Sequence, residues 1–200
     1  MPELWSLENE IYDSGIKVLC GVDEAGRGPL AGPVCAAAVI LPRGLEIKGL
    51  NDSKKLSEKK REELYELITE KALAYGIAFA EVEEIERLNI LEATFLAMNR
   101  AIGKLAIKPE LALIDGNRNK GIETVSRCVV KGDSQCADIA AASVLAKVTR
   151  DRYMLQMAEI YPQYHFEKHK GYGTKLHYEA IREHGPSPIH RLSFLRKMHG

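Results

Sequence analysis

Four carboxylates stand at the points where apolar, strand-like segments of the chain end. Asp23 and Glu24 follow the segment VLCGV, Asp115 ends the segment LALID, and Asp133 comes three residues after SRCVV. In a mixed sheet, strand ends that share one edge bring residues that are distant in sequence into a single cleft. Crowded carboxylates repel one another unless a cation neutralises them, and all-oxygen ligands suit Mg²⁺ or Mn²⁺ rather than zinc. The pattern therefore predicts a divalent-metal site.

Such a site is suited to the hydrolysis of a phosphodiester. Two divalent ions about 4 Å apart can activate a water on one side of the phosphorus and stabilise the leaving oxygen on the other, so no side-chain nucleophile is required. A structural role is the alternative for each acid taken alone, because carboxylates after strands also form turns and cap helices. Asp23 and Glu24 are sequence neighbours, so both reach one cleft only if the strand twists or ends between them. The glycines that follow favour an early end.

A glycine-rich segment, AGRGPLAGP, follows these two acids over residues 25–33, and we call it the glycine turn. Gly26 and Gly28 flank Arg27, and a glycine backbone can take positive φ and approach a ligand without interference from a Cβ atom. Main-chain amides and carbonyls then remain free to bind that ligand. The alternative is a tight turn that carries a surface arginine.

The elements that position these residues follow from hydrophobic periodicity and from capping and turn residues. Short apolar segments predict strands at 17–24, 33–41, 76–82, 111–115 and 124–130. Amphipathic segments predict helices that begin at Ser57 and Asn89 and helices over 137–160 and roughly 174–184. Strands that are first joined by turns and later alternate with helices predict an α/β fold, in which helices flank both faces of a mixed sheet. Small side chains at the start of helix 137–160 predict close packing on that sheet.

Length and composition predict one globular domain. The chain has 200 residues, of which 46% are hydrophobic, and we expect residues 1–200 to form this domain with a small helical lobe at about 161–200. The chain has no run of about 18 apolar residues, and its first residues are acidic, so we expect neither export nor membrane insertion. The four cysteines lack zinc-ligand spacing and are expected to be reduced and mostly buried in a cytoplasmic protein.

Basic side chains are concentrated at the end of the chain. The formal net charge of the whole sequence is zero, but residues 161–200 contain seven Lys and Arg against three acids, together with all six histidines. Such a segment is suited to phosphate contacts, and a solvated basic surface is the alternative. The histidines are expected to face phosphates or solvent.

The string GVDEAGRGPLAGPV, residues 21–34, resembles the signature of the ribonuclease HII family. Six further segments resemble the same family in the same order: LNDSKKLS (50–57), LIDGN (113–117), KGDS (131–134), AAASVLAKVTRD (140–151), KGYGTKLH (170–177) and HGPSPIHRLSF (184–194). The resemblance covers nearly the whole chain. It implies a ribonuclease H-like fold of the α/β class, with a five-stranded mixed sheet flanked by helices and a C-terminal helical segment.

The resemblance also implies roles for particular residues. The metal ligands of the family match the four acids described above, Asp23, Glu24, Asp115 and Asp133. The family's turn that contacts the ribose 2′-OH, the group by which a protein distinguishes RNA from DNA, matches Gly26, Arg27 and Gly28.

Five further residues are expected near the substrate. Tyr172 matches the family's tyrosine that packs on the adjoining deoxyribose, and the alternative is a tyrosine that shields the core. Lys54 is expected to approach a phosphate. Lys147 and Arg150 lie about one helical turn apart, so both are expected to face the nucleic acid, or else solvent. Asp151 is a further acid close to the site in this interpretation.

The function implied by the resemblance is hydrolysis of the RNA strand of RNA–DNA hybrids and incision 5′ of ribonucleotides embedded in duplex DNA. Catalysis would use two metal ions and leave 5′-phosphate ends, and its role would be removal of misincorporated ribonucleotides and RNA primers. The expected partners are RNA–DNA hybrids and DNA duplexes that contain ribonucleotides, with no membrane and no obligate protein partner. Three alternatives are a metal-dependent DNA nuclease on the same fold, a non-catalytic hybrid binder and a structural adaptor. Presence of all four acids argues against the binder.

Overall fold

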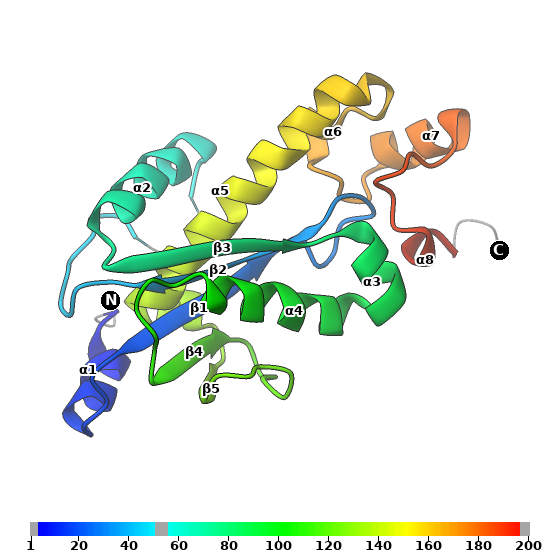
Figure 1. Ribbon diagram of the computed structural model, residues 1–200. Helices are drawn as coiled ribbons and strands as arrows, with labels where there is room; N and C mark the ends of the chain where they lie inside the picture. Colours follow the sequence, from blue (N-terminus) through cyan, green and yellow to red (C-terminus); the bar gives the residue numbers. More distant parts are fainter. Residues whose placement is uncertain (1–3, 51–55, 197–200) are drawn as a thin grey trace.

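The computed structural model describes residues 4–50 and 56–196, and Figure 1 shows its helices and strands. In chain order they are α1 (Ser6–Asp13), β1 (Leu19–Ala25), β2 (Val34–Ile40), α2 (Glu58–Lys71), β3 (Ala74–Ala80), α3 (Val82–Leu88), α4 (Ile90–Gly103), β4 (Leu111–Asp115), β5 (Ser126–Val129), η2 (Gly132–Ser134), α5 (Ala137–Ile160), η3 (Pro162–Tyr164), α6 (Phe166–His169), α7 (Lys175–His184) and α8 (Leu192–Leu195). Lys54, which was expected to approach a phosphate, lies outside the described residues.

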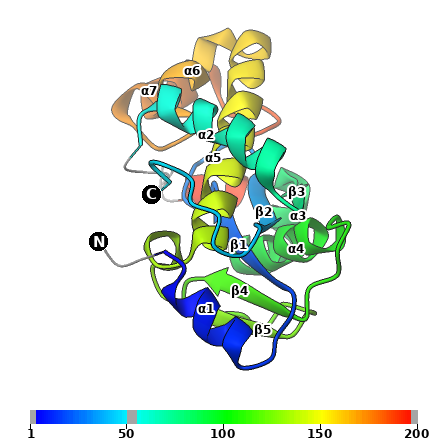
Figure 2. The ribbon, with the colours of Figure 1, turned by 90° about the vertical axis from the view of Figure 1, so that its left-hand side faces the viewer.

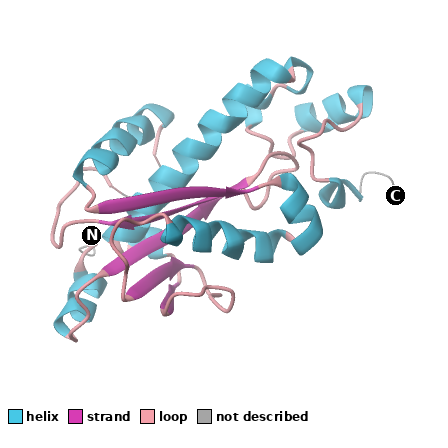
Figure 3. Cartoon of the chain, in the orientation of Figure 1, coloured by secondary structure: helices cyan, strands magenta, loops and turns pink. Residues whose placement is uncertain are grey.

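The strands form one five-stranded sheet in the order β3-β2-β1-β4-β5, shown in Figure 3. β1 pairs antiparallel with β2, and β2 pairs antiparallel with β3. β4 is parallel to β1, and β5 is parallel to β4. The predicted mixed sheet is therefore confirmed. Its middle strand, β1, carries Asp23 and Glu24 at the junction of the antiparallel and parallel halves.

Helices cover both faces of this sheet, as predicted and as Figures 1 and 2 show. On one face, Cys20 and Val22 of β1 share a buried cluster with the apolar side of α4. On the other face, α5 and α2 pack together against β2. The approach of α5 is close, because a Cβ atom on Gly21 would lie only 2.2 Å from main-chain atoms of Asp138 and Ile139. The small side chains at the start of α5 permit this approach.

The first turn of α5 is held by the N-terminal part of the chain. Within the described residues, Cys136 before the helix makes no side-chain hydrogen bond to its first turn. Instead, Ala137 N donates to Leu4 O at 3.0 Å and Asp138 N donates to Glu8 Oε1 at 3.2 Å. Glu8 thus satisfies an amide that the helix itself leaves unpaired. Both Glu8 and Asp138 are fully buried, and burial raises the pKa of Glu8 to about 7.

The C-terminal segment, residues 161–196, packs against the far end of α5 and against the glycine turn. Leu30 and Ala31 of the turn share a buried cluster with Met154 of α5 and with Phe166 of α6. A single β-bridge also pairs Ala31 with His190. Figure 1 shows the segment at the end of the molecule opposite α1.

In the described part of the chain, no helix has the length and apolar character needed to cross a membrane.

Three histidines of this segment are buried, which corrects the expectation that the histidines face phosphates or solvent: His169, His177 and His190. Ser187 N donates to His190 Nδ1 at 2.8 Å, so Nε2 of this ring carries the proton and donates to His177 Nε2 at 3.0 Å. His177 Nδ1 in turn donates to Tyr172 O at 2.9 Å. Burial lowers the pKa of His177 and of His190 to about 4. The neutral rings therefore hold the main chain at Tyr172.

Candidate active site

Strand register places Asp23 and Asp115 next to each other. β1 and β4 are parallel and pair Val22 with Ile114. The next residues of the two strands are Asp23 and Asp115, whose main chains are therefore about 4.8 Å apart, the usual spacing of neighbouring strands. Side chains alternate between the two faces of a strand. Because Leu113 packs on the α5 side, Asp115 and its neighbour Asp23 also face α5.

Asp23 is buried between the sheet and α5. The residue is 3% exposed, its Oδ1 accepts a hydrogen bond from Glu24 N at 2.7 Å, and its carboxylate also bonds with Ser143 of α5. Burial raises the pKa of Asp23 well above its ordinary range, and the charges of Glu24 and Asp115 raise it further. These carboxylates are thus close enough to repel one another.

Asp133 is brought to Asp115 by a short helical turn. It lies in η2, which follows Lys131 at a φ of 56°. Gly132 N donates to Asp115 Oδ1 at 2.7 Å, so the residue directly before Asp133 is in contact with Asp115. Asp133 is itself 7% exposed. Register thus places Asp23 beside Asp115, and the Gly132 amide places the main chain before Asp133 against Asp115.

Glu24 lies on the other side of β1 from Asp23 by strand alternation. The expected early end of the strand is wrong, because β1 continues to Ala25 and pairs Glu24 with Ala36 of β2. Pairing with β4, however, stops at Val22, so Glu24 lies beyond the end of that ladder. Its Oε1 is 3.4 Å from Nη1 of Arg27, which ties it to the glycine turn.

Most of the predicted substrate contacts line one cavity next to these acids. Its volume is about 680 Å³, and its lining residues are Glu24, Ala25, Gly26, Arg27, Gly28, Arg61, Ile90, Ser143, Lys147, Tyr172 and Phe194. The set contains five of the seven predicted substrate contacts. Arg150 does not line the cavity, and Lys54 lies outside the described residues. The cavity joins the glycine turn to α5 and to the C-terminal segment.

Tyr172 presents its ring to this cavity. The residue is 43% exposed, so it does not shield the core. Lys147 Nζ lies 5.9 Å from the centre of the ring and 2.7 Å from Asp151 Oδ1. The flanking Gly171 has a φ of 86°, and a Cβ atom there would lie 2.7 Å from Ala31 O. The close approach of the glycine turn therefore explains why a glycine precedes the tyrosine.

The expectation that Arg150 faces nucleic acid or solvent is wrong. Arg150 is 1% exposed, and it donates to the carbonyl oxygens of Ala31, Pro33 and Lys170 at 3.0, 3.1 and 3.0 Å. Arg191 is likewise fully buried and binds main-chain carbonyls of the glycine turn. Two arginines of basic segments therefore hold the turn instead of meeting phosphates.

Ser143 belongs to the site although no sequence argument selected it. It bonds with Asp23 and lines the cavity. The sequence carries a usable signal for it, because Ser143, Lys147 and Asp151 are spaced by four residues and therefore share one face of a helix.

The donor chemistry of the four acids, which we call the acid cluster, fits a divalent cation. Carboxylate oxygens are the ligands that Mg²⁺ and Mn²⁺ prefer. Burial is the main cause of the raised pKa of Asp23, and the charges of Glu24 and Asp115 add to it, a repulsion that a cation would relieve. Across residues 4–50 and 56–196, however, no group of three or more His, Cys, Asp and Glu side chains is arranged to hold an ion. The carboxylates of the acid cluster would therefore have to rotate toward a common point.

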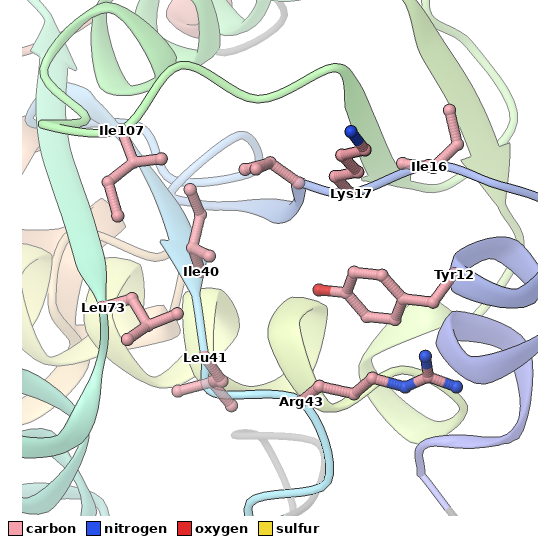
Figure 4. A pocket seen from close by; sticks show the side chains of 9 residues that line it. Tyr12, Ile16, Lys17, Ile40, Leu41, Arg43, Leu73 and Ile107 are labelled. Atoms are coloured by element: carbon pink, nitrogen blue, oxygen red, sulfur yellow. The ribbon is translucent and has the colours of Figure 1, made fainter.

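A second hollow, of about 420 Å³, lies at the other end of β1. Figure 4 shows the side chains that line it, which are Tyr12, Ile16, Lys17, Val18, Ile40, Leu41, Arg43, Leu73 and Ile107. The Tyr12 hydroxyl points into it. Its described lining contains no carboxylate, so it lacks the ligands that metal-dependent hydrolysis requires.

Known proteins resemble this chain over most of its length. The family model described as Ribonuclease HII matches residues 20–197. The chain belongs to the ribonuclease HII family. A ribonuclease HII of Marinomonas sp. (strain MWYL1) is 64% identical over 178 residues, which are 88% of this chain and 89% of that protein. A ribonuclease HII of Endomicrobium trichonymphae is 56% identical over 192 residues, which are 96% and 91% of the two chains.

Solved structures of ribonucleases H share the fold. The crystal structure of the ribonuclease H2 from Pyrococcus horikoshii OT3 matches with a TM-score of 0.74 and 26% identity, over 91% of this chain and 97% of that one. The structure of Bst-RNase HIII in complex with Mn²⁺ matches with a TM-score of 0.70 and 21% identity, over 87% and 65% of the two chains, and shows the fold alone. The ribonuclease H-like fold is therefore confirmed. As a ribonuclease HII, the chain is a metal-dependent endonuclease with ribonuclease H activity on RNA–DNA hybrids.

Proposed function

We propose that this ribonuclease HII also incises duplex DNA on the 5′ side of embedded ribonucleotides, by catalysis with two metal ions. The role of this reaction is removal of misincorporated ribonucleotides and RNA primers. One observation carries the proposal: the cavity lined by the glycine turn is also lined by Glu24 of the acid cluster and by Ser143, which bonds with Asp23. A ribose held at the turn would therefore lie beside the acids.

The glycine turn supports recognition of a single ribose. Its Arg27 and Gly28 are exposed at the cavity. A 2′-OH both donates and accepts hydrogen bonds, and main-chain amides and carbonyls offer both partners. A Cβ atom added at Gly28 would lie 3.8 Å from Cε1 of Tyr172. The turn and the tyrosine are thus close enough to contact adjoining nucleotides of one strand, the ribose at the turn and the deoxyribose at Tyr172.

The residues that would hold the metal ions, Mg²⁺ or Mn²⁺, are Asp23, Glu24, Asp115 and Asp133. When bound, two such ions supply an activated water and stabilise the leaving oxygen. The chain orients the ligands through the amide of Gly132 on Asp115 and through Ser143 on Asp23. Lys147, which lines the cavity, offers a positive charge to a phosphate of the substrate.

The test is incubation with a DNA duplex that carries one ribonucleotide, in the presence of Mg²⁺, Mn²⁺ or a chelator. We expect a cut on the 5′ side of the ribonucleotide with either ion and no cut with the chelator, read on a denaturing gel. A matched all-DNA duplex is the control and should stay intact. Comparable cutting of the all-DNA duplex would instead identify a structure-specific DNA nuclease.

Asp115→Asn is expected to lower cleavage of this duplex at least about 100-fold, because a bound metal ion contributes several kcal/mol of charge stabilisation. Binding of the uncut duplex, measured by fluorescence anisotropy, should persist because phosphate contacts dominate affinity. Asp13→Asn is the matched control, since Asp13 is an exposed carboxylate paired with Arg43 at 2.7 Å, and it should cleave like the wild type. Loss of binding together with cleavage would indicate a structural role for Asp115.

We further propose that the protein acts in the cytoplasm and that residues 1–200 fold as one domain. All four cysteines are free and three of them are buried, which fits a reducing compartment. The C-terminal segment shares a buried cluster with α5 and the glycine turn, which supports a lobe that folds together with the rest of the chain.

A further inference from the structure

Arg191 is fully buried against the glycine turn and binds its main chain. Nη2 donates to Gly26 O at 2.6 Å, and Nη1 donates to Arg27 O at 3.0 Å and to Pro29 O at 2.9 Å. Nε donates to Gly32 O at 2.9 Å. One guanidinium thus binds four carbonyls across the turn.

The position of Arg191 is fixed by contacts within the protein. Its amide donates to Leu30 O at 2.8 Å, and its guanidinium carbon lies 5.2 Å from the centre of the Phe194 ring. Ser193 Oγ donates to Glu86 Oε1 at 2.7 Å, which ties α8 to α3. The arginine is therefore in place before any substrate binds.

The carbonyls that Arg191 binds determine where the neighbouring amides point. In a trans peptide, the carbonyl oxygen and the N–H that follows it point in opposite directions, and the described residues contain no cis peptide. Because Gly26 O and Arg27 O point to Arg191, the amides of Arg27 and Gly28 point away from it. The turn separates the buried Arg191 from the cavity that Gly26, Arg27 and Gly28 line. The two amides are thus directed to the side from which a ribose approaches.

A guanidinium suits this position and an ammonium does not. The five N–H donors of arginine lie in one plane and reach acceptors spread over several directions. Lysine concentrates three donors at the tip of a flexible chain. A lysine at position 191 would keep the charge but could not bind carbonyls as far apart in the turn as those of Gly26 and Gly32.

We propose that Arg191 is a positioning residue for ribose recognition, which presents the amides of Arg27 and Gly28 to the 2′-OH by holding the carbonyls on the opposite side of the turn. The inference rests on the proposed function of the glycine turn. Arg191 itself does not touch the substrate. Substitution of Arg191 should therefore lower kcat/KM on a duplex with one ribonucleotide, while the affinity for an all-DNA duplex stays unchanged.

The experiment compares Arg191→Lys with Leu195→Ala at a temperature where circular dichroism shows both variants folded. Leu195 is 3% exposed in the same segment, so its truncation loosens the segment without removing a hydrogen bond to the turn. We expect Arg191→Lys to lower kcat/KM on a duplex with one ribonucleotide about 10-fold to 100-fold, the effect of one or two lost hydrogen bonds. Its affinity for the matched all-DNA duplex, measured in chelator, should stay within about twofold. Leu195→Ala should keep kcat/KM close to the wild type.

The inference would be overturned if folded Arg191→Lys kept the wild-type kcat/KM on this duplex. It would also be overturned if Leu195→Ala lowered kcat/KM as much as Arg191→Lys does. If Arg191→Lys does not fold, Arg191→Gln replaces it, because glutamine keeps two donors without a buried charge. Failure of both variants to fold at low temperature would make Arg191 a requirement of folding and would also overturn the inference. If the wild-type chain leaves the ribonucleotide duplex intact with Mg²⁺ and Mn²⁺, the proposed function itself is wrong and the inference falls with it.

Discussion

Gly26 and Gly28 belong to one turn but meet different surroundings. Gly26 has a φ of 97°, and a Cβ atom there would lie 2.0 Å from Nε and 2.4 Å from Cδ of Arg150. Arg150 cannot move aside easily, because it is buried and bound to three carbonyls. At Gly28, Tyr172 Cε1 is the only side-chain atom of the described residues within 4 Å of an added Cβ, at 3.8 Å. The fold therefore requires the first glycine, and the open cavity accounts for the second.

Gly26→Ala is expected to lower the free energy of unfolding by about 1–3 kcal/mol, through overpacking and backbone strain. Gly28→Ala should leave stability unchanged and should lower cleavage of a ribonucleotide-containing duplex, because its Cβ narrows the space beside Tyr172. Urea unfolding and cleavage, measured on the same preparations, separate the two effects. Equal stability of the two variants would contradict this assignment.

Single residues were predictable where local pattern decides their position. Strand-end logic selected Asp23 and Asp115, and the register of β1 and β4 places them side by side. The burial of Arg150 and Arg191 was not predictable, because most of their acceptors are carbonyls of a turn more than 100 residues earlier in the chain. No local sequence pattern distinguishes a basic side chain that binds main-chain carbonyls from one that contacts a phosphate.

At the scale of the elements, the Glu8 carboxyl group of α1 accepts a hydrogen bond from the first turn of α5. The pKa of Glu8 is about 7 in the folded chain, against an ordinary value of 4.5. The folded state therefore holds this proton more tightly than the unfolded state does. The resulting stabilisation is complete below about pH 4.5 and is lost as the pH rises through about 7. A shift of this size corresponds to about 3 kcal/mol.

Glu8→Gln is expected to remove this part of the pH dependence, because an amide can still accept from Asp138 N but does not titrate. Between about pH 5 and about pH 8, the wild type should lose stability relative to the variant by up to about 3 kcal/mol in urea unfolding. Glu10→Gln, an exposed change on the same helix, is the control and should follow the wild type. Parallel pH profiles for wild type and Glu8→Gln would rule the explanation out.

Acid is expected to loosen α7 through the buried histidines. The pKa of His177 and of His190 is lowered by burial from 6.5 to about 4. Their stabilisation is therefore present above about pH 6.5 and is lost as the pH falls through about 4. Hydrogen exchange should show α7 losing protection over this range. His177→Asn, which keeps a donor near the Nδ1 position, should reduce the loss, whereas the exposed His184→Gln should not.

Long, strongly patterned helices were predicted well, and the short helices α1 and α3 were not predicted. The helix expected over 137–160 coincides with α5, and the helix expected from Asn89 begins with the Asn89 side chain bound to the amides of its first turn. α3 was not predicted, because it has only 7 residues and its N-cap is Glu81, whose capping box uses acids in place of Ser or Thr. α1 has 8 residues, about two turns, which is too short for a repeated hydrophobic pattern to stand out in the sequence.

On the scale of the whole molecule, α5 connects the two ends of the chain. Its first half packs with α2 and β2, and its second half, through Met154, packs with the C-terminal segment. We therefore expect urea unfolding followed by Trp5 fluorescence to coincide with unfolding followed by far-ultraviolet circular dichroism. Trp5 directly precedes α1, and Figure 1 shows α1 at the end of the molecule opposite the C-terminal segment. Two separate transitions would show that residues 161–200 form an independent unit.

α5 also fixes the distance between the acid cluster and the glycine turn. An α-helix rises about 1.5 Å per residue, so Ser143 at the acid cluster and Arg150 at the glycine turn are separated by about 10 Å along one stiff axis. Inserting a single residue between them would rotate everything that follows by about 100°, turning Arg150 out of its carbonyl acceptors. The spacing between the acid cluster and the glycine turn is thus set by seven residues of one helix. This part of α5 should therefore tolerate substitutions far better than insertions or deletions.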